Sequence, residues 1–196
     1  SVTTVDNIGS GGATNDGTIV STVTVNQPSF LNGGTSYDFG GGRVTAAAFP
    51  TQTEWTLEAW INWDGAKIQQ CNIFGQDQPG WNDDVLFGIA PEQGGQPFPA
   101  NNFGIVQQGA PGATRDWANA PVTANEWHHV AATGSTTDGE LKFYVDDVLV
   151  DTDDSFINGI TMNGHQFAVG DNRFEGIYSF DGLIDEFAIY DKVLDA

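Results

Sequence analysis

The sequence has one cysteine, one methionine and six basic residues, and it has no long hydrophobic run. Because Cys71 stands alone, no disulfide can form within the chain and no thiolate metal cluster can be built. Nothing in the sequence pairs this thiol with a base, so we expect a buried, inert cysteine. No stretch approaches the ~18 apolar residues that a membrane-spanning helix needs. The sequence therefore predicts no insertion into a membrane.

The shortage of basic residues leaves a large excess of negative charge. The chain has 26 acidic residues against six basic ones, which gives a net charge of −20. A field of this sign repels nucleic acids and anionic membranes, so neither is an expected partner. Most of the carboxylates are expected to be solvated surface groups of a secreted protein. Asp outnumbers Glu, and Asp suits turns and the coordination of hard cations.

Helical periodicity is also nearly absent, and short alternating segments take its place. Their punctuation by Gly, Asn and Asp indicates a β-sandwich or barrel. Asp146 and Asp147 lie at the tip of a predicted hairpin, in a two-residue turn that needs positive φ. No linker divides the chain, so residues 1–196 are expected to form one domain. The clearest predicted strands cover residues 55–63, 126–133, 141–145, 148–152, 167–170 and 183–190.

The last predicted strand contains an unexpected carboxylate. In "LIDEFAIY", strict alternation puts Asp185 on the same face as Leu183, Phe187 and Ile189. A strand that buries Phe187 and Ile189 then also turns the Asp185 carboxylate inward, and an unpaired buried carboxylate is costly. A cation, a set of backbone N–H groups or open solvent at the strand end is therefore expected to meet it.

Four segments follow one another along the chain: "TEWTLEAWINWDG", "NEWHHVAATGSTTDGELKFYVDDVLVDT", "FAVGDN" and "FDGLIDEFAIYDKVL". Their order and spacing resemble those of laminin-G-like domains of the concanavalin A-like lectin/glucanase superfamily, in the branch found in bacterial secreted proteins. The stretch "DNIGSGGATNDGTIV" resembles the Asp-rich opening loop of that branch, although the strand that usually precedes it is missing or much reduced. The resemblance implies an all-β fold, a two-sheet antiparallel β-sandwich of the jelly-roll type.

The resemblance also implies a structural Ca²⁺ ion. Relatives commonly hold it between the N-terminal segment and the Asp of the final strand, which gives Asp6 and Asp185 as the expected ligands here. Ca²⁺ takes about six to eight oxygens, and the Gly-rich loop 8–17 would offer carbonyl groups. The alternative is that Asp185 caps backbone amides at the sheet edge without a metal.

The tryptophans divide between strands and loops. Trp81 and Trp117 lie in a loop-rich region, 76–121, and a planar ring beside polar side chains suits sugar recognition. The alternative is that each ring attaches its own loop to the sandwich. The expected polar contacts of a sugar are Asn82, Asp83, Asp84, Asn172 and Tyr178, in segments that also hold Asp77, Asp171 and Arg173. The remaining tryptophans are assigned mostly to the core: Trp55, Trp60, Trp63 and Trp127.

Catalytic patterns are missing. His128 and His129 are strand neighbours that point to opposite faces, so a zinc site is not expected. A retaining glycosidase needs two carboxylates ~5–5.5 Å apart, and the Glu-x-Asp-x-Glu pattern of the superfamily's glucanases does not occur. The Arg, Gln-x-His and Tyr arrangement of alginate lyases of similar fold is missing as well. The sequence therefore does not predict an enzyme.

Together these features predict a non-catalytic extracellular carbohydrate-binding module with structural calcium, as part of a larger secreted or surface protein. The net charge disfavours polymers rich in uronate or sulfate, so a neutral polysaccharide is the expected glycan. The alternative is a structural or adhesive domain that binds protein partners or acts as a spacer in a surface adhesin. Exposed loop tryptophans would favour the first interpretation, and buried ones the second.

Overall fold

In the computed structural model, the described part of the chain consists mainly of β-strands. Within the described residues, a single short helix, η1 (Gly12–Asn15), accompanies fifteen strands. No helix among the described residues is both long and apolar enough to cross a membrane. The described residues are 4–6, 8–10, 12–31, 33–50, 52–66, 71–76, 84–90, 101–108, 115–153, 166–171 and 178–195.

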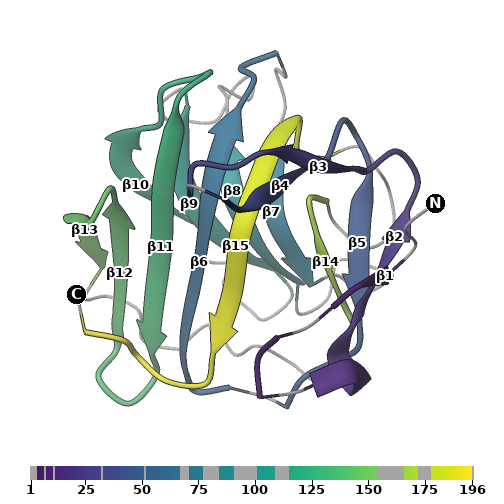
Figure 1. Ribbon diagram of the computed structural model, residues 1–196. Coiled ribbons are helices and arrows are strands. Elements are labelled where there is room, and N and C mark those ends of the chain that lie inside the picture. Colours follow the sequence, from purple (N-terminus) through teal and green to yellow (C-terminus); the bar gives the residue numbers. More distant parts are fainter. Residues whose placement is uncertain are drawn as a thin grey trace.

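The strands form two antiparallel sheets that stack face to face (Figure 1). The first sheet contains, in spatial order, β1 (Thr4–Val5), β2 (Gly17–Val20), β5 (Arg43–Ala46), β14 (Phe167–Val169), β7 (Cys71–Gln76), β8 (Asp84–Ala90), β9 (Asn102–Gln108) and β10 (Arg115–Pro121). The second contains β13 (Val148–Asp153), β12 (Glu140–Val145), β11 (Trp127–Ser135), β6 (Glu54–Trp63), β15 (Gly182–Tyr190), β4 (Thr35–Asp38) and β3 (Thr24–Pro28). The predicted jelly-roll β-sandwich is confirmed.

The core lies between the sheets, and β6 shows how the sequence builds it. Successive side chains of a strand point to opposite faces, so every second residue of β6 enters the core. Cys71 on β7 is buried as well, as predicted, and its inertness stays a prediction. The five core residues of β6, none more than 2% exposed, are Trp55, Leu57, Ala59, Ile61 and Trp63.

The same alternation places Trp60 outside the core. Trp60 shares its face of β6 with Glu58 and Asn62, and all three are only partly buried. Trp127, which pairs with Asn62, is partly buried too. The assignment of Trp60 and Trp127 to the core is therefore wrong, because the period of two decides the face of a strand residue whatever its hydrophobicity.

Strand β15 changes face halfway along its length. In its first half Ile184 packs in the core, so Leu183 and Asp185 point to the opposite face. A β-bulge then interrupts the pairing with β6 between Asp185 and Ala188. Glu186 takes up the extra residue with a φ of 48°, in the left-handed region.

Beyond the bulge the two faces are exchanged. Phe187 and Ile189 pack against the core, whereas Asp185 lies opposite Trp60 on the other side of the sheet. The prediction that Asp185 shares a face with Phe187 and Ile189 is wrong, because strict alternation does not allow for one inserted residue. The β12–β13 hairpin agrees with the prediction: Asp146 and Asp147 have φ values of 51° and 62°.

Candidate functional site

The outer face of the seven-stranded sheet, which we define as its face opposite the core, carries a cluster of aromatic, carboxylate and imidazole side chains. Strand pairing puts Asp185, Trp60 and His129 in one row across β15, β6 and β11. In the next row Glu58 lies between two alanines, one on each neighbouring strand. That row contains Ala188, Glu58, Ala131 and Tyr144.

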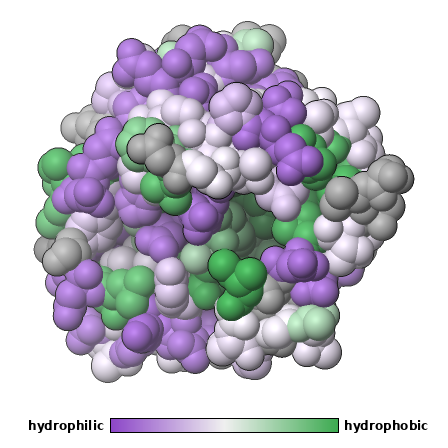
Figure 2. All heavy atoms as spheres, in the orientation of Figure 1, coloured by the Kyte–Doolittle hydropathy of each residue, from purple (hydrophilic) through white to green (hydrophobic). Residues whose placement is uncertain are grey.

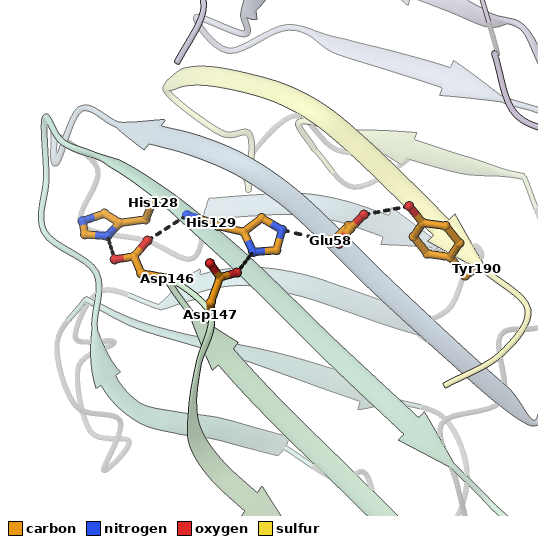
Figure 3. Close-up of polar contacts among 6 residues, drawn as sticks. All are labelled: Glu58, His128, His129, Asp146, Asp147 and Tyr190. Atoms are coloured by element: carbon orange, nitrogen blue, oxygen red, sulfur yellow. Dashed lines mark hydrogen bonds and ion pairs between the residues drawn. The ribbon is translucent and has the colours of Figure 1, made fainter. Parts of the chain in front are cut away.

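A chain of polar contacts runs across this face from β15 to the β12–β13 hairpin (Figure 3). The Tyr190 hydroxyl donates a hydrogen bond to Glu58 Oε1 at 2.8 Å. The other carboxylate oxygen, Glu58 Oε2, lies 3.4 Å from His129 Nε2. The second ring nitrogen, His129 Nδ1, lies 3.6 Å from Asp147 Oδ1. One imidazole is therefore flanked by carboxylates on both sides.

The hairpin turn supplies the far end of this chain. Its left-handed residues direct Asp146 and Asp147 back toward β11. Asp146 Oδ1 accepts a hydrogen bond from the His129 backbone amide at 3.0 Å, and Asp146 Oδ2 lies 2.8 Å from His128 Nδ1. Both neighbouring histidines thus contact carboxylates.

These contacts keep Glu58 ionised. The hydrogen bond from His129 lowers the pKa of the Glu58 carboxyl, and the Tyr190 hydroxyl adds to that effect, while partial burial opposes it. The hydrogen bond between Tyr190 and Glu58 also raises the pKa of the Tyr190 phenol, because Tyr190 donates to an anion. A group whose pKa is lowered is a hydrogen-bond acceptor at neutral pH and is poorly suited to protonate a leaving group.

An aromatic pair stands beside this polar chain. Phe30 stacks on Trp60 with ring centroids 4.1 Å apart and an interplanar angle of 17°. On the other side, the His129 ring lies 5.2 Å from the Trp60 centroid. Phe30 is 50% exposed, and the following Leu31 is 40% exposed. An apolar ring surface therefore faces solvent next to hydrogen-bonding groups.

Asp185 fixes the connection that carries Phe30. The Ser29 hydroxyl donates a short hydrogen bond to Asp185 Oδ2, and the Glu186 backbone amide donates to Asp185 Oδ1 at 3.0 Å. Ser29 Oγ in turn accepts a hydrogen bond from the Leu31 amide at 2.9 Å. The Asp185 carboxylate, which strict alternation predicts to point inward, thus lies on the outer face. Each of its two oxygens accepts one hydrogen bond.

The space-filling view of this side shows hydrophilic residues over most of the surface, with hydrophobic ones scattered among them (Figure 2). Near its middle the surface is hollowed, and hydrophobic atoms lie in and beside the hollow. Such a mixture suits a ligand that has both apolar C–H surfaces and hydroxyl groups.

Of the residues expected to bind sugar, the structure places Trp117, Asp84 and Tyr178, which lie on or next to the eight-stranded sheet. Trp117 pairs with Gly104, Gly104 with Gly88, and Gly88 with Asn72, in one row across four strands. The backbone amide of Asn72 donates a hydrogen bond to the backbone carbonyl of Tyr178 at 2.8 Å, so Tyr178 lies at the end of the same row.

Asp84 lies elsewhere on that sheet. It pairs with Gln108, four residues along β8 from Gly88, which corresponds to roughly 13 Å. The side chains of Asp84 and Trp117 are not among those described. The remaining predicted contacts, Trp81, Asn82, Asp83 and Asn172, lie outside the described residues, as do Asp77 and Arg173. These residues stay predictions.

The expected calcium ligands lie on different sheets. Asp6 is exposed and follows β1 at the edge of the eight-stranded sheet, whereas Asp185 belongs to β15. Both oxygens of Asp185 already accept protein donors. Among the described residues no group of three or more His, Cys, Asp or Glu side chains is arranged to hold a metal ion. By themselves these residues do not supply the oxygens that Ca²⁺ needs, and calcium binding stays a prediction.

Sequence reasoning did not identify the outer-face cluster. A period-of-two signal for Trp60 was present in "WTLEAWINW", because Glu58 and Asn62 flank it at the same parity. No local signal links Ser29 to β15 or Phe30 to β6, since Ser29 and Asp185 are 156 positions apart and Phe30 meets Trp60 only in the assembled sheet.

Solved structures of similar fold include several that bind carbohydrates. Domain 4 of AbnA, an extracellular arabinanase from Geobacillus stearothermophilus solved with arabinotriose, aligns with a TM-score of 0.71 at 18% identity, over 95% of this chain and 87% of that one. A putative carbohydrate binding protein from Bacteroides ovatus aligns with a TM-score of 0.64 at 20% identity, over 89% of this chain and 54% of that one. The CBM40 of a Ruminococcus gnavus IT-sialidase, bound to sialyllactose, aligns with a TM-score of 0.57 at 16% identity, over 74% of this chain and 78% of that one.

These likenesses establish the fold. No curated protein sequence matches the chain. A laminin-G family model, described as that of the concanavalin A-like lectin/glucanases superfamily, matches residues 33–196. The match covers most of the chain, and the chain therefore belongs to the concanavalin A-like lectin/glucanases superfamily.

Proposed function

We propose that the protein is a non-catalytic, extracellular carbohydrate-binding module, and that it holds its glycan on the outer face of the seven-stranded sheet. The observation that carries this proposal is the stacked Phe30–Trp60 pair, in which Phe30 is 50% exposed and Trp60 lies on the same face as Glu58 and His129. A sugar ring presents C–H groups on one face and hydroxyls at its edge. An aromatic surface next to charged acceptors and donors satisfies both needs.

Each group has a role in such a complex. The Phe30 ring packs against the C–H face of a sugar, supported from behind by Trp60. Glu58, held ionised, accepts hydrogen bonds from hydroxyls with the lone pairs that its contacts leave free. Neutral glycans are favoured over polyanionic ones, because the protein carries a net charge of −20. The glycan complexes among the structures of similar fold support carbohydrate as the ligand class.

The test is isothermal titration of the unsubstituted chain with arabinotriose and with laminarin and xylan oligosaccharides. Single-site modules of this kind are expected to bind with Kd near 10⁻⁴ M, or roughly 5–6 kcal/mol. Phe30→Ala should weaken binding about 30-fold, the cost of a lost aromatic anchor of about 2 kcal/mol. The matched variants Trp81→Ala and Trp117→Ala test the loop residues in the same assay.

Binding that survives Phe30→Ala and disappears in Trp81→Ala or Trp117→Ala would move the site to the eight-stranded sheet. Absence of binding to any glycan would favour the structural or adhesive alternative. One observation supports that alternative: Val148 and Leu149, on the edge strand β13, are 60% and 49% exposed and could contact a protein partner. We also propose that this module is part of a larger secreted or surface protein.

A further inference from the structure

The loop between β3 and β4 meets the outer face of the seven-stranded sheet at Trp60 and Asp185. Ser29, Phe30 and Leu31 precede residue 33, where the match to the family begins, whereas Trp60 and Asp185 lie within the match. The aromatic pair therefore takes one ring from outside the match and one from within it.

The Ser29 side chain attaches the loop to the sheet. Ser29 Oγ donates to Asp185 Oδ2 and accepts from the Leu31 amide, so a single hydroxyl both fixes the loop to β15 and closes its turn. Asp185 is 8% exposed, which keeps water from competing for the contact. Hydrogen bonds to an ionised carboxylate are among the stronger ones in proteins.

The register of the sheet places the Ser29–Asp185 contact beside Trp60. Asp185 pairs with Trp60 across β15 and β6, so their side chains rise from neighbouring positions on one face. The loop residue bound to Asp185 is followed directly by Phe30, which stacks on the Trp60 ring. The bulge at Glu186 turns Phe187 and Ile189 to the core face while Asp185 stays on the outer face, and the Glu186 backbone amide donates to the other carboxylate oxygen of Asp185.

From this geometry we infer that Asp185 is a positioning residue, which holds residues 29–31 as a specificity loop over Trp60. The inference rests on the proposed function, because it names the group that orients the sugar-binding ring. Asp185 touches no sugar in this arrangement and acts through Ser29. Without the contact Phe30 leaves Trp60, and the ring surface offered to the glycan loses its orientation.

A fluorine label on the ring tests the position of Phe30 without any glycan. With 4-fluorophenylalanine at residue 30 of the full chain, stacking on Trp60 should shift the ¹⁹F signal upfield. The same label in Trp60→Ala gives the chemical shift of the unstacked ring, against which this change is measured. Ser29→Ala and Asp185→Ala should each move the signal toward that of Trp60→Ala. Ser29→Thr keeps the hydroxyl and should retain the shift. Asp191→Ala removes an exposed carboxylate from the end of the same strand and should also retain it.

The same variants are then titrated with arabinotriose and laminarin oligosaccharides. Ser29→Ala and Asp185→Ala should each raise Kd about 10-fold, and the double variant should be no weaker than the worse single one, because both remove one interaction. Retained affinity in Ser29→Thr, with unchanged melting temperature, separates positioning from general stability.

An unshifted fluorine signal in Ser29→Ala would overturn the inference, as would a signal that moves without any change in Kd. If Asp185→Ala fails to fold, Ser29→Ala decides the matter alone, since it leaves β15 and its bulge intact. A chain that binds no glycan refutes the proposed function, whereas the fluorine signal separately reports whether the loop is anchored. The two failures are therefore distinguishable.

Discussion

The contact between Tyr190 and Glu58 allows a quantitative prediction about stability and pH. Tyr190→Phe removes only the hydroxyl that donates to Glu58 Oε1 at 2.8 Å. A hydrogen bond to a charged group contributes about 1.5–3 kcal/mol, and the partial exposure of this pair reduces the expected loss to about 1–2 kcal/mol. For a chain of this length, each kcal/mol lowers the melting temperature by about 2–4 °C. The expected loss at pH 7 is therefore roughly 2–8 °C.

The loss should depend on pH in a defined direction. The folded-state pKa of Glu58 is lowered, so its contribution to stability is complete above the unfolded value of 4.5 and disappears as pH falls through the folded value. The pKa of Tyr190 is raised, so its contribution is complete below 10.0 and disappears as pH rises through the folded value. Between these limits the difference between wild type and Tyr190→Phe should be constant.

Thermal unfolding followed by circular dichroism from pH 3 to pH 8 measures this difference. Tyr144→Phe is the control, because Tyr144 lies on the same face one row away and is also partly buried. It should cost less than Tyr190→Phe at pH 7, and its cost should not depend on Glu58. A Tyr190→Phe loss that does not decrease once the pH falls below the point at which Glu58 titrates in the folded protein would refute the reasoning, since the carboxylate would then have no part in it.

Two further predictions concern the metal and the core. If Asp6 and Asp185 hold Ca²⁺, millimolar Ca²⁺ should raise the melting temperature of EDTA-treated protein by several degrees, since a ligand at 100 times its Kd stabilises the fold by about 2.7 kcal/mol. Asp185→Ala should abolish the rise and Ser29→Ala should preserve it; no rise and no bound metal by elemental analysis would remove the calcium hypothesis. Gly134→Ala should lower stability by about 1–3 kcal/mol, because a Cβ there would lie 2.4 Å from the Trp55 ring. Denaturant unfolding at equilibrium tests this, and an unchanged midpoint would show that the ring has room to move.

Local sequence patterns predicted the fold well and the outer face poorly, for a physical reason. Alternation in β6 and the Asp146–Asp147 turn are properties of neighbouring residues, so the sequence contains them directly. A bulge is a property of two paired strands. Nothing within "LIDEFAIY" shows that Glu186 is the inserted residue, and the face of Asp185 was therefore assigned wrongly.

The candidate site shows the same limit more strongly. Glu58 and Trp60 could have been placed on the outer face from their parity alone. Ser29 and Phe30 could not, because their partners are Asp185 and Trp60, which only the assembled sheet brings near. The loop residues chosen for their composition remain untested, since composition indicates what a side chain can bind but does not place it.

The position of β15 has a consequence for the order in which the protein folds. β15 follows every other strand of its sheet in the sequence, yet it lies between β6 and β4. Until β15 has been synthesised, the four strands on one side and the β3–β4 hairpin on the other have no shared border. One edge of the β3–β4 hairpin therefore stays unpaired while the residues between β4 and β15 are synthesised. A nascent chain of this kind is expected to fold late and to need protection of that exposed edge during synthesis.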